Sequence, residues 1–164
     1  MKHTALLPAL FSTACMFAPN NAAWSGVMDA LDPRTERVVE MCNAYCSNDP
    51  AAWTRYYAED AIAHVNDSDL SVDAMTAAYA AGHAVFAGIR HENVTCTTMR
   101  YSNGQVFTNY WYVWVGTARS TGEELRVKGY AWFRWEGDDV VESYNAFDPT
   151  RYNAIAAGSP AEIK

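Results

Sequence analysis

Residues 105–135 carry the most regular apolar pattern of the chain, QVFTNYWYVWVGTARSTGEELRVKGYAWFRW. Two stretches rich in valine and aromatic residues flank the run Arg119–Gly122, whose composition is typical of a turn between strands. Nine of the residues are aromatic: Phe107, Tyr110, Trp111, Tyr112, Trp114, Tyr130, Trp132, Phe133 and Trp135. Because they occupy both odd and even positions, each face of the predicted hairpin needs a cover, with helices on one face and a partner subunit or second sheet on the other.

The same pattern predicts four successive strands in the second half of the chain. They span residues 94–101, 105–118, 124–135 and 140–147. Short polar runs that contain glycine separate them, at residues 102–104, 120–122 and 136–139. Strands joined by such short turns pair with their neighbours, so we expect an antiparallel meander.

The first half of the chain shows helical periodicity. A first helix begins with Asp32 as N-cap and Pro33 in its first position. Its apolar stripe consists of Val38, Met41, Cys42 and Tyr45. A second helix begins near Pro50, and places Trp53, Tyr56 and Tyr57 on one face.

A short strand over residues 61–65 and a polar loop over residues 66–71 precede the third helix. That helix begins with Ser71 as N-cap and ends near Gly88. Three helices followed by an antiparallel meander predict an α+β fold, with the three N-terminal helices packed on one face of the sheet.

Composition narrows the class of protein. With 164 residues, half of them apolar, the chain has the size of one globular domain. Its net charge of −7 argues against nucleic acid and against anionic membrane surfaces as partners, because both attract basic patches.

Residues 1–23 have the features of a secretory signal peptide: a basic start at Lys2, a short apolar run over residues 4–18, and small residues at Ala22 and Ala23. The run is too short to be a stable membrane span. We therefore expect a mature domain over residues 24–164 that is secreted or periplasmic. The alternatives are an uncleaved tail and a lipid anchor on Cys15, which follows an imperfect lipobox.

Three internal cysteines, Cys42, Cys46 and Cys96, lack the paired spacing of a zinc site. No metal or organic cofactor is expected from any spacing in the chain. We expect buried free thiols, and a single disulfide to Cys96 is the alternative.

Three phrases of the chain resemble the SnoaL-like group of the nuclear transport factor 2-like (NTF2-like) superfamily. They are YAEDAIAH at residues 57–64, WFRWEGDDVVE at residues 132–142 and YNAFDP at residues 144–149. The resemblance covers residues 32–152. It implies an NTF2-like cone whose curved sheet wraps around a pocket, and a homodimer formed through the outer sheet face.

Catalytic residues are expected at His64 and Asn145. His64 ends the first strand phrase, where many SnoaL-like chains have histidine, and an imidazole can act as acid or base near neutral pH. Asn145 lies within the last strand and can orient an oxygen. The alternative for His64 is a structural residue held by hydrogen bonds at the strand edge. The alternative for Asn145 is a hydrogen bond to a neighbouring side chain or to water. The resemblance places the two carboxylates of steroid isomerases near Val65 and Ala131, and since both are apolar that mechanism is not expected.

Further ligand-binding residues are expected among the aromatic and polar positions of the helices and strands: Trp53, Tyr57, His83, Asn109, Trp111 and Phe147. The choice of Asn109 and Trp111 depends on the register of the hairpin. A slip of one residue turns Tyr110 and Tyr112 into the pocket instead. His91 is expected at the surface or in a turn.

These residues favour a pocket for a small hydrophobic ligand. If the domain is an enzyme, we expect a cofactor-independent lyase, isomerase or cyclase with a histidine acid or base. The alternatives are a non-catalytic ligand-binding module and a dimeric interaction module. Iota-type carbonic anhydrases resemble this architecture, but their terminal His-His-Ser-Ser run is not matched by residues 144–147.

Overall fold

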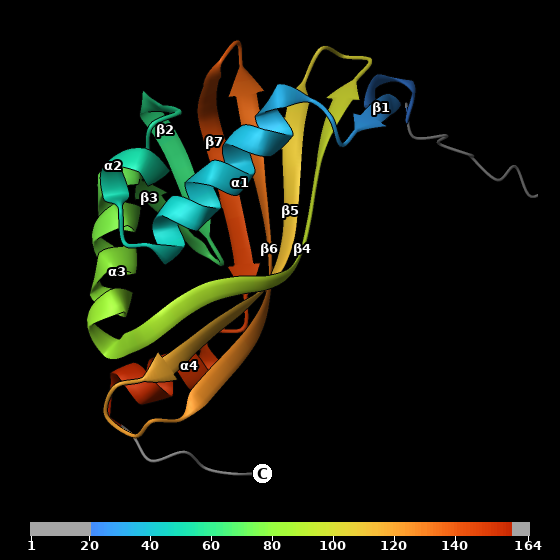
Figure 1. Cartoon of the computed structure of the whole chain (residues 1–164). Helices are drawn as coiled ribbons and strands as arrows, with labels where there is room; N and C mark the ends of the chain where they lie inside the picture. The colour runs from blue at the N-terminus through green and yellow to red at the C-terminus, as the bar shows by residue number, and fades with distance from the viewer. Residues whose placement is uncertain (1–20, 159–164) are drawn as a thin grey trace, which may run out of the picture.

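The computed structural model describes residues 21–158, and in this part of the chain one seven-stranded sheet curves around three of the four α-helices (Figure 1). The strand order is β1-β4-β5-β6-β7-β2-β3. The strands are β1 (Gly26–Asp29), β2 (Tyr57–Val65), β3 (Ser68–Ser71), β4 (Phe86–Tyr101), β5 (Val106–Ala118), β6 (Glu124–Glu136) and β7 (Asp139–Phe147). The helices are α1 (Pro33–Cys46), α2 (Pro50–Trp53), α3 (Val72–Val85) and α4 (Thr150–Ala156), and a 3-10 helix η1 (Asn21–Trp24) precedes β1.

The predicted α+β fold is confirmed. Strands β4 to β7 form an antiparallel meander, while β2 runs parallel to β7 and pairs with β3 as a hairpin. α1 packs on β4 and β5, and α3 packs on β2, β3 and β4, so the helices cover the concave face. Figure 1 shows α1 crossing the sheet and α4 below it.

Two irregularities bend β4 around the helices. Its register to β5 shifts between Ala87 and Arg90 and again between Glu92 and Thr95. Each shift contains a residue with positive φ, Gly88 at 61° and Asn93 at 51°. Such bulges increase the local twist of a strand. They make the sheet concave enough to surround a cavity.

The hairpin register turns alternate residues of β5 inward. Thr108, Tyr110, Tyr112 and Trp114 are buried on the concave side, whereas Trp111 is exposed on the outer side. Gly129, which is paired with Tyr112, makes room for the tyrosine ring, because a Cβ there would lie 2.3 Å from its Cζ. The alternative register, with Tyr110 and Tyr112 inside, is the one that the protein adopts.

α1 is held over the sheet by a buried carboxylate at its start. The side chain of Asp32 accepts a hydrogen bond of 2.9 Å from the backbone N–H of Arg34 and pairs with Arg100 of β4. Burial acts to raise the pKa of Asp32, but the two contacts together favour the ionised form and lower the pKa below its usual value. Behind this cap, the hydroxyls of Thr35, Thr98 and Thr108 form a buried hydrogen-bonded chain.

Several element boundaries differ from the prediction. α2 ends at Trp53, so Tyr57 begins β2 instead of continuing a helix, and residues 68–71 form β3 instead of a loop. β4 begins at Phe86, eight residues before the predicted strand, because the bulges interrupt its alternation of apolar and polar residues. The short elements β1 and α4 were not predicted.

The predicted signal peptide lies largely outside the described residues, which begin at residue 21. Within the described part of the chain, none of the helices has the length and apolar character needed to cross a membrane. Cys42, Cys46 and Cys96 are free thiols.

Candidate functional site

A cavity of about 230 Å³ lies between the concave face of the sheet and the helices. Eleven of its twenty-one lining residues are Phe, Tyr or Trp, contributed by α1, α2, α3, α4 and the central strands. None of the lining residues is Asp, Glu, Lys or Arg. Aromatic walls with few polar groups are typical of sites for small apolar ligands.

Burial keeps the polar groups of the cavity uncharged. It raises the pKa of the Tyr79 hydroxyl to about 12, so the phenol stays protonated at neutral pH. It lowers the pKa of His91 to about 4, so the imidazole is neutral above that pH. The cavity therefore carries no net charge under physiological conditions.

Asn145 lies between two tyrosines at one wall of the cavity. The Tyr112 hydroxyl donates to Asn145 Oδ1 at 2.7 Å, and Asn145 Nδ2 donates to the Tyr79 hydroxyl at 2.6 Å. Two residues earlier on β7, Ser143 accepts a hydrogen bond of 3.0 Å from the Tyr57 hydroxyl. This wall joins β7 to β5, α3 and β2 through side-chain hydrogen bonds.

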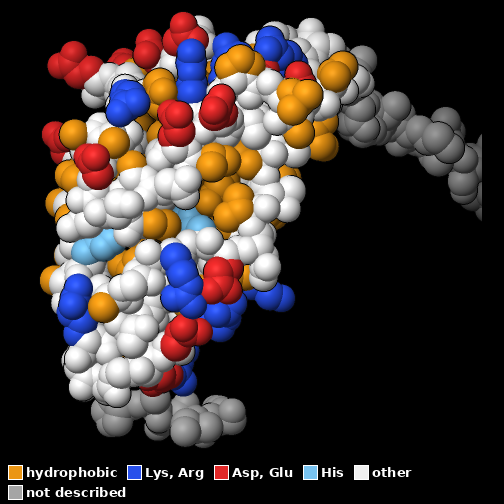
Figure 2. Space-filling view, in the orientation of Figure 1, with side chains coloured by type: hydrophobic (Ala, Val, Ile, Leu, Met, Phe, Trp, Pro, Cys, Tyr) orange, Lys and Arg blue, Asp and Glu red, His pale blue; other side chains and the backbone are white. Residues whose placement is uncertain are grey.

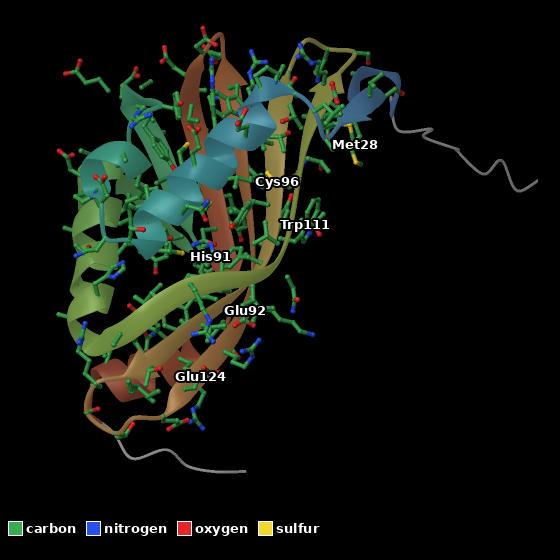
Figure 3. The ribbon with its side chains drawn as sticks, in the orientation of Figure 1. Met28, His91, Glu92, Cys96, Trp111 and Glu124 are labelled. Atoms are coloured by element: carbon green, nitrogen blue, oxygen red, sulfur yellow. The ribbon has the colours of Figure 1, made fainter. Side chains whose placement is uncertain are left out.

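His91 contributes the imidazole of the cavity, although its sequence context predicted a surface or turn position. It lies on β4, beside the C-terminal end of α1 (Figure 3). Its Nδ1 is 3.1 Å from the Tyr110 hydroxyl, and its ring centroid is 4.2 Å from that of Tyr112. Its Nε2 is buried and has no hydrogen-bond partner among the described residues.

Of the residues expected at the site, Asn145, Trp53, Tyr57 and Phe147 line the cavity. Asn109 and Trp111 do not, because the register turns them to the outer face, where Asn109 Oδ1 accepts from the Tyr130 hydroxyl at 2.7 Å. His83 packs behind the wall, with its ring centroid 5.4 Å from that of Tyr45.

His64 also lies on the outer face, away from the cavity. Its two ring nitrogens contact carboxylates, Nδ1 with Asp69 at 2.6 Å and Nε2 with Glu142 at 2.9 Å. The hydrogen bond to Asp69, helped by Glu142, raises the pKa of His64. Its neighbour Val65 lines the cavity instead, since alternate strand residues face opposite sides. The acid or base role expected for His64 is therefore not assigned to this cavity.

Val65 and Ala131 are both in the cavity wall. These are the positions that the resemblance assigned to the two carboxylates of steroid isomerases, so the cavity has apolar groups where such enzymes have acids. Within the described residues, no group of three or more His, Cys, Asp or Glu side chains is arranged to hold a metal ion.

The chain belongs to the SnoaL-like domain family, whose sequence profile matches residues 37–143. No curated protein matches it in sequence.

Solved structures share its fold at low identity. A protein of ketosteroid isomerase-like fold from Catenulispora acidiphila, solved with trimethylamine, has a TM-score of 0.61 at 15% identity, covering 79% of this chain and 97% of that one. AclR, a proposed hydroxylase from Streptomyces galilaeus, has a TM-score of 0.60 at 15% identity, covering 77% and 97%. A proposed polyketide cyclase from Xanthomonas campestris has a TM-score of 0.58 at 16% identity, covering 74% and 95%.

Burial of His91 predicts a pH-dependent stability. The folded protein binds a proton at His91 near pH 4, whereas the unfolded chain binds it near 6.5, so acid favours unfolding. Compared with His91→Phe, the wild-type protein is expected to lose up to about 3 kcal/mol of unfolding free energy as the pH falls from 6.5 to 4. Urea unfolding followed by circular dichroism at several pH values measures this difference.

His64→Gln is the matched control. Because the pKa of His64 is raised in the folded state, its contribution is present at low pH and is lost as the pH rises through the folded pKa, which is the opposite direction. Parallel pH profiles for the wild type and His91→Phe would contradict the burial of a neutral imidazole.

Proposed function

We propose that this SnoaL-like domain is a cofactor-independent isomerase or cyclase that acts on a small, uncharged, largely apolar molecule inside the cavity. The observation that carries the proposal is the neutral imidazole of His91, whose Nε2 has no partner among the described residues, in an aromatic cavity without charged side chains. Neighbours of the same fold that are described as polyketide cyclases and as an isomerase support this class of reaction.

His91 is the group in this cavity proposed to accept a proton, and a movement of its ring must expose the buried Nε2 to the ligand. The role requires the tautomer in which Nδ1–H donates to the Tyr110 hydroxyl, so that Nε2 carries the lone pair. A base whose conjugate acid has a pKa of about 4 is weak, and it suits a C–H bond already acidified by an adjacent carbonyl. The C–H bond breaks and its proton goes to Nε2, while the C–H electron pair forms a C=C bond and the π pair of the carbonyl moves to its oxygen. In a β,γ-unsaturated ketone, the proton then returns from Nε2 to the γ-carbon as the oxygen pair re-forms the carbonyl, which completes the isomerisation.

Deuterium exchange tests this step without knowledge of the natural substrate. The bicyclic ketone 2-tetralone, incubated with the protein in D₂O, is expected to incorporate deuterium at its α-carbon faster than in buffer alone, as measured by NMR. His91→Gln is expected to lower the protein-catalysed rate by at least about 100-fold. His64→Gln, altered on the outer face, is expected to retain the rate.

A second candidate is a non-catalytic module that binds the same kind of ligand. It is favoured by the apolar side chains of Val65 and Ala131, where related isomerases have carboxylates, and by the pairing of Asn145 with two tyrosines. Saturable binding of 2-tetralone without accelerated exchange would establish this candidate and exclude the enzyme.

We also propose that the outer sheet face forms a homodimer. Four aromatic rings, the aromatic row, cross this face with successive centroids 5.3 to 5.8 Å apart: Trp24, Tyr101, Phe107 and Trp132. Beside the row, Trp111 is 42% exposed, which is high for a large aromatic side chain. Arg90, Glu92, Glu124 and Arg126 form an ion-pair cluster of both signs further along the face (Figure 3).

Charge at Trp111 is expected to separate the protomers. Trp111→Arg places a cation in the apolar part of the proposed interface and is expected to raise the dimer dissociation constant by at least about tenfold. Leu31→Arg is the control, because Leu31 is 92% exposed and precedes α1, which covers the opposite face. Light scattering over a range of concentrations measures both, and a wild-type protein that stays monomeric at high concentration would overturn the proposal.

Export through residues 1–23 is a further proposal, and it rests on the sequence pattern. The mature protein is expected to begin near Trp24. Intact mass of the protein recovered from the culture medium or periplasm measures the cleavage, and a retained Met1 would exclude it. A lipid-modified Cys15 would instead add the mass of acyl chains and leave the protein in the membrane fraction.

A further inference from the structure

The hydrogen bonds around Asn145 leave one phenolic hydrogen unused. An amide has an oxygen that accepts and an NH₂ group that donates, so one of its two tyrosine partners must donate and the other must accept. In the structure Tyr112 donates and Tyr79 accepts, so the Tyr79 hydrogen has no acceptor among the described residues. Exchanging the amide oxygen and nitrogen would free the Tyr112 hydrogen instead, and the count of one free donor stays the same.

A second hydrogen-bonded pair, Tyr57 and Ser143, also leaves one hydroxyl hydrogen without an acceptor among the described residues. Tyr57 donates its hydrogen to Ser143 Oγ at 3.0 Å, which leaves the Ser143 hydrogen without an acceptor among the described residues. Ser143 and Asn145 are two residues apart on β7 and therefore point to the same side of the sheet. Two hydroxyl donors thus face the cavity from one wall.

The position of the Tyr79 hydroxyl is fixed by packing. Its ring stacks on Trp53, with centroids 5.1 Å apart and planes inclined by 28°, and the ring of Tyr45 lies 5.5 Å away. A donor held in place before the ligand arrives loses little entropy on binding. In a cavity without charged side chains, such a donor also interacts more strongly than it would in water.

From this polarity we propose that Tyr79 and Ser143 form a two-donor site for an oxygen atom of the ligand, and that Asn145 is the positioning residue that directs the Tyr79 hydroxyl toward it. The cavity then prefers ligands with a carbonyl or enolate oxygen, which accepts hydrogen bonds at this wall, over ligands of the same shape that donate hydrogen bonds there. This inference rests on the proposed function, since it assumes that the cavity holds a small molecule.

Three bicyclic probes of nearly equal size separate the possibilities in the wild-type protein. 2-Tetralone accepts a hydrogen bond, tetralin has no polar group, and 1,2,3,4-tetrahydroquinoline offers an N–H donor. We expect 2-tetralone to bind at least about tenfold more tightly than the other two, the value of one well-placed hydrogen bond. Quenching of the fluorescence of Trp53 and Trp114, which line the cavity, measures the affinities.

Substitutions at the amide pair test the positioning role. Tyr79→Phe is expected to lower the affinity for 2-tetralone toward that of tetralin, with the remaining preference due to Ser143, and to leave the affinity for tetralin unchanged. Asn145→Asp is expected to do the same with Tyr79 intact, because a carboxylate accepts from both tyrosines and consumes the free hydrogen. The control is Tyr130→Phe, which removes the phenolic hydroxyl that pairs with Asn109 on the outer face. It is expected to leave the affinities for all three probes unchanged.

Infrared spectroscopy of bound 2-tetralone reports the hydrogen bond directly. The carbonyl stretch is expected at lower frequency in the wild type and in Tyr130→Phe than in Tyr79→Phe or Asn145→Asp, a shift that a structural effect on affinity alone would not produce. Equal affinity for all three probes would overturn the two-donor site and leave the proposed cavity function intact. Failure of every probe to bind would overturn both.

Discussion

The inward alternation of β5 is the constraint on which the site depends. Tyr110, Tyr112 and Trp114 all project from the concave face and are buried there. Their burial offsets the conformational entropy that is lost when the strand becomes ordered. α1, anchored through Asp32, covers them from above. Because the bulged β4 keeps the sheet curved, these bulky rings line a cavity instead of filling a flat core.

The same burial decides the chemistry of the cavity. Desolvation disfavours charge, so the tyrosines remain phenols and His91 remains a neutral imidazole. Polar groups in such surroundings must pair with one another or with a ligand. Tyr112, Asn145 and Tyr79 pair with one another, which leaves one hydroxyl hydrogen for the proposed ligand. On the outer face, solvent stabilises charged groups. His64 lies there and contacts the carboxylates of Asp69 and Glu142.

The outer face differs from the inner one in organisation. Its aromatic rings form a row across the strands. At the edge of the sheet, Figure 2 shows hydrophobic side chains where β1 lies, in agreement with the exposure of Val27 and Met28, which face opposite sides of that strand. Arginine and glutamate side chains of both signs gather separately, near Glu92 and Glu124 (Figure 2 and Figure 3). This arrangement supports the homodimer proposed above, because an apolar contact area would provide affinity and the charged groups beside it would set the orientation.

Local signals in the sequence determined the α+β class, the SnoaL-like family and the helix starts at Asp32 and Ser71, because periodicity and capping act over a few residues. The family resemblance placed Asn145 on an inward strand position, where it lines the cavity. Only the tertiary structure decided whether the odd or the even residues of β5 face inward. It also showed that His91, and not the predicted His64, lines the cavity. Strand alternation is identical in either register, so only the packing of α1 against a bulged sheet selects the side on which each ring is buried.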